Sequence, residues 1–483
     1  MSISAMGALP GRRSAAIVSG IRPELRETLR LGSPLALAEI GWMSTYLVDA
    51  MMVGRLPEGA SGIAASSLGN TIFYAIVFFG VGLLFGLDTL VAQAFGRQDR
   101  KGCLFLLTQS VWLVALWTPL TWLLLRGTSP LLRWDGIDPA LAAQTLHYLG
   151  ALRWSTLPLL AYMALRRYLQ SINLSIAIMV SLVTANLVNL VADWALLFGH
   201  LGAPRLGLAG SGWATGIVRL YMLGILLFAF IRQLRRDKLQ LTAHMFVPSA
   251  KPLRALFRLG WAPAIQTMAD LGVSTVQTLL CGRLGAVALA VNQVVLDVAA
   301  MVYMVPYGIS AATAVRVGQS VGADHRRGVG FATRAGSWIS ILFAGSAAIF
   351  FLAVPRRLAS IYTVDPAVIA ASVSIFAIAA LYQPFDAWET CLAGSLRGLG
   401  DTRTSMLAGV LWSWVIGLPL TWWLALHTPL GIYGLWIGRA IPAICTAINV
   451  ALVWRSRFDS LYPPHRNPSQ NQTGNRLPVP HLA

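Results

Sequence analysis

The sequence predicts an all-α membrane protein, with about twelve transmembrane helices in two pseudo-twofold-related six-helix lobes around a central cleft. Three observations support this prediction. The chain of 483 residues is 56% hydrophobic and only 12% charged. Its apolar residues form long runs that are separated by short charged connections. The second half of the chain also repeats glycine positions of the first half.

Composition argues against a soluble globular protein. Soluble domains contain about 25% charged residues, whereas this chain has a mean hydropathy of +0.65. Lipid must therefore solvate most of its surface. A net charge of +18 often indicates a nucleic-acid partner. Here the basic residues fall between apolar runs, so we interpret them as an orientation signal and expect no nucleic-acid partner.

Each membrane span requires about 20 mostly apolar residues. Runs of that length predict spans near residues 32–54, 68–92, 103–125, 143–165, 175–198, 208–231, 256–280, 287–312, 335–354, 367–394, 405–426 and 432–454.

Charge alternates along the connections between these spans. Basic residues gather before the first span, after the second, sixth and eighth spans, and after the twelfth, whereas the opposite connections carry less positive charge. Lys and Arg accumulate on the cytoplasmic side of membrane proteins. We therefore expect a multi-pass protein of the inner (plasma) membrane with both termini in the cytoplasm.

The longest polar stretch inside the chain lies at its midpoint and predicts the boundary between the lobes. The segment after the last span is rich in Pro, Asn and Gln, which is typical of disorder. The expected divisions are an N-terminal tail at 1–30, an N-lobe at 31–231, a linker at 232–255, a C-lobe at 256–454 and a disordered tail at 455–483.

Glycines repeat between the two halves of the chain. Gly54 matches Gly282 at a shift of 228 residues (282 − 54), and Gly82 matches Gly308 at a shift of 226 (308 − 82). An even number of spans in each half gives both halves the same orientation, related by an axis along the membrane normal. Two parallel lobes around a cleft are typical of transporters.

Four short motifs occur in order along the chain. They are VD at 48–49 with VG at 53–54, GLDT at 86–89 with QAFG at 93–96, RVG at 316–318 with GA at 322–323, and DA at 386–387 with LRG at 396–398. Together they resemble signatures of the multidrug and toxic compound extrusion (MATE) transporters. The resemblance covers almost the whole chain, from about Leu31 to Trp454.

The resemblance implies a secondary active antiporter that works by alternating access. It would export organic, mostly cationic compounds or drugs in exchange for Na⁺ or H⁺, without a cofactor, as a monomer. The chain has no GxxxxGK[ST] phosphate loop to bind ATP and no visible catalytic motif, so we do not expect an enzyme. The alternative is a flippase for lipid-linked precursors or polysaccharide from the same superfamily, whose anionic cargo requires a basic cleft.

Carboxylates inside the spans are the strongest candidates for function. Each costs about 3 kcal/mol or more at membrane depth, and burial favours the protonated form whereas a nearby cation favours the ionised form. Eight acidic residues lie in or at the edge of a predicted span: Glu39, Asp49, Asp88, Asp193, Asp270, Asp297, Asp386 and Glu389. For Asp88 we expect a structural role, with a cap or an Arg as its partner.

In the first half, Asn189 and Asp193 are four residues apart and therefore share one helix face. The alternative to a functional role is an interhelical hydrogen-bonded pair. The resemblance implies that they belong to an N-lobe cation or proton site. That site consists of Asp49, Tyr148, Asn189, Asp193 and Thr215.

In the second half, Tyr382 and Asp386 share a helix face in the same way. The resemblance implies a C-lobe cation or substrate site of Asp270, Tyr382 and Asp386. Na⁺-coupled bacterial members usually carry Glu where this chain has Asp270, so the identity of the coupling ion stays open. Na⁺ could occupy either acidic site. Auxiliary candidates are Glu39, Asp297 and Glu389.

Overall fold

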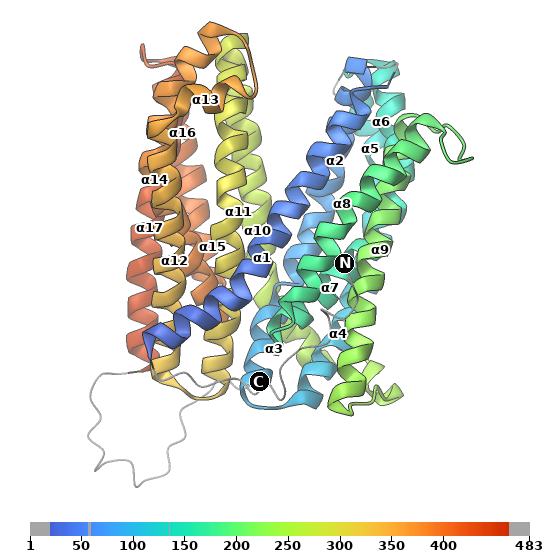
Figure 1. Ribbon diagram of the computed structural model, residues 1–483, viewed down its shortest axis with the longest axis vertical. Helices are drawn as coiled ribbons and strands as arrows, with labels where there is room; N and C mark the ends of the chain where they lie inside the picture. Colours follow the sequence, from blue (N-terminus) through green and yellow to red (C-terminus); the bar gives the residue numbers. More distant parts are fainter. Residues whose placement is uncertain (1–19, 57–58, 135, 463–483) are drawn as a thin grey trace.

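The computed structural model describes residues 20–56, 59–134 and 136–462, and these form helices joined by short connections (Figure 1). The helices of the first half are α1 (Ile21–Val53), α2 (Gly59–Leu83), α3 (Gly86–Gly96), α4 (Arg100–Arg126), α5 (Thr128–Trp134), α6 (Pro139–Leu152), α7 (Thr156–Ser171), α8 (Ser175–Phe198) and α9 (Leu208–Asp237). The helices of the second half are α10 (Ala250–Arg283), α11 (Ala286–Gly322), α12 (Arg326–Ala353), α13 (Pro355–Ser360), α14 (Pro366–Leu399), α15 (Arg403–Val410), α16 (Leu418–Leu426) and α17 (Ile432–Leu461).

Every predicted span coincides with helix, although three spans are interrupted. The second span is α2 followed by α3, and the fourth is α6 and α7 joined by the 3₁₀ turn Arg153–Ser155. The eleventh span runs through a π-helical segment, Leu411–Gly417, between α15 and α16. In the described part of the chain, nine helical stretches are long and apolar enough to cross a membrane by composition alone. The other three spans, in α1, α6–α7 and α10, carry charged side chains close to or within their apolar runs.

Helices extend into the segments predicted as tails and linker. Helix α1 begins at Ile21, before the expected lobe boundary at residue 31, and α17 continues to Leu461, past the expected boundary at 455. Within the predicted linker, a 3₁₀ turn, Ala243–Phe246, packs on α4, where Gln109 Nε2 donates to the carbonyl of Met245 at 3.0 Å. Such contacts with neighbouring helices lie beyond what local composition reveals. The remainder of both predicted tails falls outside the described residues.

Two bundles form the molecule, and α1 crosses between them (Figure 1). In the figure the bundles meet at the lower end and diverge toward the upper end. Each bundle has its own apolar core, one centred on residues of α2–α9 and one on residues of α10–α17. The N-terminal part of α1 packs on the second bundle, where its Gly32 lies against Ile309 of α11. The first helix thus ties the two lobes together.

Of the repeated glycines, Gly82 and Gly308 lie where the two lobes touch and have reciprocal contacts, whereas Gly54 and Gly282 meet no atom of the other lobe. A Cβ added to Gly82 would overlap the backbone of Ala264, and one added to Gly308 would overlap the backbone of Ala36. Ala36 and Ala264 are themselves related by the 228-residue repeat (264 − 36). Gly96 of α3 and Gly322 of α11 make reciprocal contacts of the same kind with the backbone of the other helix. Close helix approach through glycine therefore explains why these glycines occur in both halves.

Polar contacts reinforce this interface at the same end of the molecule. Glu24 of α1 accepts two hydrogen bonds from the guanidinium of Arg316 in α11, both at 2.7 Å. Gln319 Nε2 donates to the carbonyl of Ser171 at 2.9 Å. The hydroxyl of Thr89 donates to the carbonyl of Arg397 at 2.6 Å. By the charge pattern of the connections, this is the end that we expect to face the cytoplasm.

Candidate functional site

The predicted N-lobe carboxylates meet through one amide group. Asp49 comes from α1, whereas Asn189 and Asp193 lie one turn apart on α8. Asn189 Nδ2 donates to Asp49 Oδ1 at 2.7 Å and to Asp193 Oδ2 at 3.3 Å. Asn189 and Asp193 are both fully buried. The fold therefore assembles a compact site from residues about 140 positions apart.

Two oxygen atoms of this cluster accept no hydrogen bond within the described structure. They are Asn189 Oδ1 and Asp193 Oδ1, and both are buried. Buried acceptors almost always have a partner. Carboxylate and amide oxygens are hard ligands that suit small hard cations. The cluster therefore has the chemistry to hold a Na⁺ ion, or a proton on one of its carboxyl groups.

The two remaining predicted members of the N-lobe site lie beside this cluster. Tyr148 donates its hydroxyl to Asn70 Oδ1 at 3.0 Å, and Asn70 lines a small cavity of about 40 Å³ together with Asp49 and Thr215. The Thr215 hydroxyl donates to the carbonyl one turn earlier, at 2.9 Å. Tyr148 therefore reaches the cavity through Asn70.

Arg219 of α9 also lines this cavity, although the sequence did not single it out as a site residue. Its guanidinium donates to the hydroxyls of Ser155 and, at 3.3 Å, Tyr74, and it lies 5.0 Å from the centre of the Phe73 ring. Its position as an isolated Arg in an apolar span could have indicated a functional role. Arg219 places a positive charge in the cavity that Asp49 also lines.

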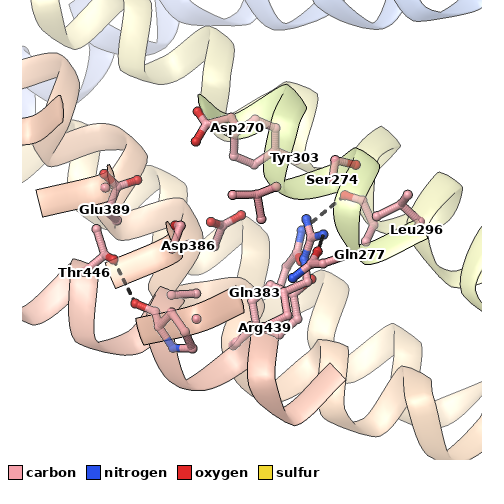
Figure 2. A pocket seen from close by; sticks show the side chains of 18 of the residues that line it. Asp270, Ser274, Gln277, Leu296, Tyr303, Gln383, Asp386, Glu389, Arg439 and Thr446 are labelled. Atoms are coloured by element: carbon pink, nitrogen blue, oxygen red, sulfur yellow. Dashed lines mark hydrogen bonds between the residues drawn. The ribbon is translucent and has the colours of Figure 1, made fainter. Parts of the chain in front are cut away.

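A larger cavity of about 330 Å³ lies inside the C-lobe and contains the predicted acidic site (Figure 2). Asp270 projects from α10, whereas Tyr382 and Asp386 project from α14. Glu389, predicted as an auxiliary residue, lines the same cavity. It follows Asp386 by three residues, so helix geometry places both on one face.

Arg439 of α17 is the cation of this cavity. Its Nη1 donates to Gln277 Oε1 at 3.0 Å (Figure 2). Gln277 stands at the position that the 228-residue repeat relates to Asp49 (277 − 49). The repeat could therefore have identified Gln277 as a residue of the C-lobe site. The sixth span of each lobe thus supplies one Arg to that lobe's cavity.

Three carboxylates and one guanidinium give the C-lobe cavity an acidic character. In the described part of the chain, no group of three or more His, Cys, Asp or Glu side chains converges on a metal-ion site. The acidic groups therefore line a cavity and do not converge on a single coordination centre. Tyr303 of α11, which no sequence pattern indicated, adds an aromatic wall and accepts a hydrogen bond from Thr390 at 3.2 Å.

The other intramembrane carboxylates have different surroundings. Glu39 forms a buried ion pair with Arg166. Asp88 pairs with Arg167 at 3.1 Å, which agrees with the structural role expected for it. Asp297 lines neither acidic cavity, and its carboxylate accepts a hydrogen bond from the Gln293 side chain at 2.8 Å.

Comparison with known proteins adds the family context. The model of the MatE family matches residues 34–195 and 263–423, one segment in each half. The chain is 33% identical over 438 residues to the multidrug resistance protein PmpM of Pseudomonas aeruginosa, covering 89% of this chain and 91% of that protein. It is 30% identical over 450 residues to the probable multidrug resistance protein NorM of Mesorhizobium japonicum, covering 92% and 96% of the two chains.

Solved structures agree in fold. A crystal structure of MATE in complex with MaD3S superposes with a TM-score of 0.84 at 18% sequence identity, and covers 93% of this chain and 99% of that chain. Agreement at such low identity concerns the backbone arrangement alone. The prediction of a twelve-span, two-lobed helical fold is therefore confirmed.

Proposed function

We propose that this chain, which belongs to the MatE family of multidrug efflux transporters, exports organic cations in exchange for Na⁺ or H⁺. Membership of the family makes it a membrane transporter and not an enzyme. The cargo, the coupling ion and the roles of individual residues are the proposed part. The names of PmpM and NorM as multidrug resistance proteins support drugs as cargo.

The acidic cavity of the C-lobe is the observation that favours cationic cargo most strongly. Asp270, Asp386 and Glu389 outnumber the single guanidinium of Arg439 around a space of about 330 Å³. Drug-sized ligands occupy pockets of about 300–1,000 Å³. An organic cation would balance this charge, and Tyr303 and Tyr382 would offer ring faces to it. An anionic lipid pyrophosphate, the cargo of the alternative flippase function, would meet repulsion there.

We assign ion coupling chiefly to the N-lobe cluster. Its cavity of about 40 Å³ is too small for a drug, and its oxygens suit Na⁺ or a proton. Either ion would neutralise part of the charge that Asp49 and Asp193 share. Ion binding would then change the packing of α1 against α8, the helices that carry the cluster.

Alternation of access follows from the reciprocal contact between the lobes. We propose that both termini are cytoplasmic, so that the glycine-lined contact closes the cytoplasmic side while the lobes diverge toward the outside (Figure 1). Because α1 carries Asp49 and also packs on α11, ion binding at Asp49 has a direct route to this contact.

The proposal is tested by efflux of a fluorescent organic cation from proteoliposomes that contain the purified protein. A Na⁺ gradient and a pH gradient are imposed separately, with empty liposomes as the control. We expect one of the two gradients to drive dye out of the liposomes when the ion flows inward. Absence of transport under both gradients would contradict the antiport function, and transport of an anionic lipid analogue instead would favour the flippase.

A further inference from the structure

We propose that a basic groove at the end of the C-lobe binds the phosphate headgroup of an anionic phospholipid. This C-lobe groove has a volume of about 430 Å³. Its walls are formed by Arg258 of α10, the connection between α14 and α15 at 400–402 with Arg403 at the start of α15, and the end of α17 with Arg457 and Ser460. It lies outside both acidic cavities, and no residue is shared with them.

The groove carries an uncompensated positive charge. Among the described residues that line it, Asp401 carries the only carboxylate, and Arg457 neutralises this group through a hydrogen bond of 2.7 Å. Asp401 also accepts hydrogen bonds from the backbone and the hydroxyl of Thr404. In the described part of the chain, no carboxylate pairs with Arg258 or Arg403, so two guanidinium groups remain for an anion. Guanidinium groups bind phosphate oxygens in a bidentate geometry.

Thr402 supplies a second, independent observation. It lines the groove, only 5% of its surface is exposed, and its Oγ1 has no hydrogen-bond partner among the described residues. Most buried hydroxyls in proteins are hydrogen-bonded. A phosphate between Arg258 and Arg403 would be an acceptor within the same groove. The backbone supports this shape, because Gly400 ends α14 with a left-handed conformation, φ 93°.

The position of the groove favours a lipid over a free anion. Helices α10, α15 and α17 all reach the end of their spans here, and the groove wall also includes Leu259, Leu399 and Leu461. Arg403 lies 5.4 Å from the ring of Trp261, and Trp side chains are typical of the membrane interface. Basic pockets between spans on the cytoplasmic side bind anionic headgroups. Here that side is the one proposed above.

The residues of the N-lobe that the repeat relates to this groove differ in charge. The position related to Arg258 is Arg30 (258 − 30 is 228), and Arg30 pairs with Glu27 at 3.7 Å. The connection between α7 and α8, which corresponds to 400–403, contains Asn173 and Leu174 and no basic residue. Arg30 is therefore a matched control for Arg258.

The experiment measures the thermal stability of the purified full-length protein in detergent as lipid is added. The additions are phosphatidylglycerol, phosphatidylethanolamine and inorganic phosphate, each to wild type and to the variants R258Q/R403Q, T402V and R30Q. We expect phosphatidylglycerol to raise the Tm of wild type and R30Q. In R258Q/R403Q we expect the apparent affinity for phosphatidylglycerol to fall about 30-fold, because each Arg contributes a factor of about five.

The outcomes separate the possible ligands. A smaller loss in T402V, and an intermediate affinity in R258K/R403K, which keeps the charge but not the bidentate geometry, would support a phosphate bound in the groove. Wild-type affinity for phosphatidylglycerol in R258Q/R403Q would overturn the proposal, as would an equal loss in R30Q. Equal stabilisation by inorganic phosphate would replace the lipid with a small anion. Because the readout is binding, a failed efflux experiment leaves this result unchanged.

Discussion

At the scale of single residues, the two acidic sites differ in how their charge is arranged. In the N-lobe, Asn189 holds two carboxylates close together, which suits a small ion. In the C-lobe, three carboxylates line a larger cavity together with Arg439. The two lobes share a helical arrangement, but their cavities differ in volume, about 40 Å³ in the N-lobe and about 330 Å³ in the C-lobe.

Neutralising either site is expected to impair transport without unfolding the protein. Asp193→Asn and Asp386→Asn each keep the shape of the side chain and remove one negative charge. A charged hydrogen bond contributes about 1.5–3 kcal/mol, so apparent affinity for the bound cation should fall by about tenfold or more. Dye efflux in proteoliposomes at matched protein amounts measures this. Asp459→Asn, which changes an exposed carboxylate, is the control, and normal efflux from both site variants would contradict the assignment.

The C-lobe cavity also distinguishes two of the auxiliary candidates. Glu389 lines the cavity and Asp297 does not, so Glu389→Gln should reduce efflux several-fold while Asp297→Asn should leave it near the wild-type rate. Concentration series for a cationic dye would locate the effect in substrate affinity. The opposite ranking of the two variants would remove Glu389 from the site.

At the scale of helices, glycine determines how closely the lobes approach. Gly96 of α3 lies against the backbone of Gln319 in α11, and Gly322 of α11 lies against the backbone of Gln93 in α3. Any side chain at either position would meet a carbonyl group that cannot move independently of its helix. Packing without side chains is what allows the helices to touch along this line.

Gly96→Ala and Gly322→Ala are expected to separate α3 from α11. Overpacking of a close contact costs about 1–3 kcal/mol, and the Tm of the purified protein should fall accordingly. Gly224→Ala on α9 is the matched control, because a Cβ there meets no atom within 4 Å. A Tm for the Gly96 and Gly322 variants equal to that of the control would show that the contact is looser than described.

At the scale of the whole molecule, α1 belongs to both lobes. Its Glu24 pairs with Arg316 of the second lobe, and its Asp49 accepts a hydrogen bond from Asn189 in the first. The repeat relates Glu24 to Pro252 (252 − 24 is 228), so the pair has no counterpart in the other half. This asymmetric ion pair is positioned to stabilise the contact between the lobes at the end that we propose to be cytoplasmic.

Glu24→Gln should therefore favour states in which this contact is open. Removing one partner of a buried ion pair costs about 3–5 kcal/mol. Ser171→Cys, in a chain whose four native cysteines are replaced by Ala, reports opening through its labelling rate with a thiol reagent. Glu27→Gln, which breaks the exposed pair with Arg30, should change the rate little. Equal rates in the Glu24 and Glu27 variants would argue against a locking role.

The sequence alone determined the spans of this protein, its division into two lobes and the helix faces that carry its carboxylates. The length of the apolar runs predicted the spans, because a helix must satisfy its own backbone hydrogen bonds in lipid. The repeated glycines predicted two related lobes. Helical spacing placed Asn189 with Asp193, and Tyr382 with Asp386, on common faces. The resemblance to transporters then named most of the acidic residues that line the two cavities.

Only the tertiary structure decided which side chains meet across helices. Spacing along α1 could not reveal that Asp49 reaches Asn189, or that Glu24 reaches Arg316 in the other lobe. Likewise spacing could not reveal that Glu39 forms an ion pair with Arg166, whereas Glu389 lines the acidic cavity of the C-lobe. The physical reason is that helical periodicity specifies a face, whereas the rotation and crossing of packed helices determine what that face contacts.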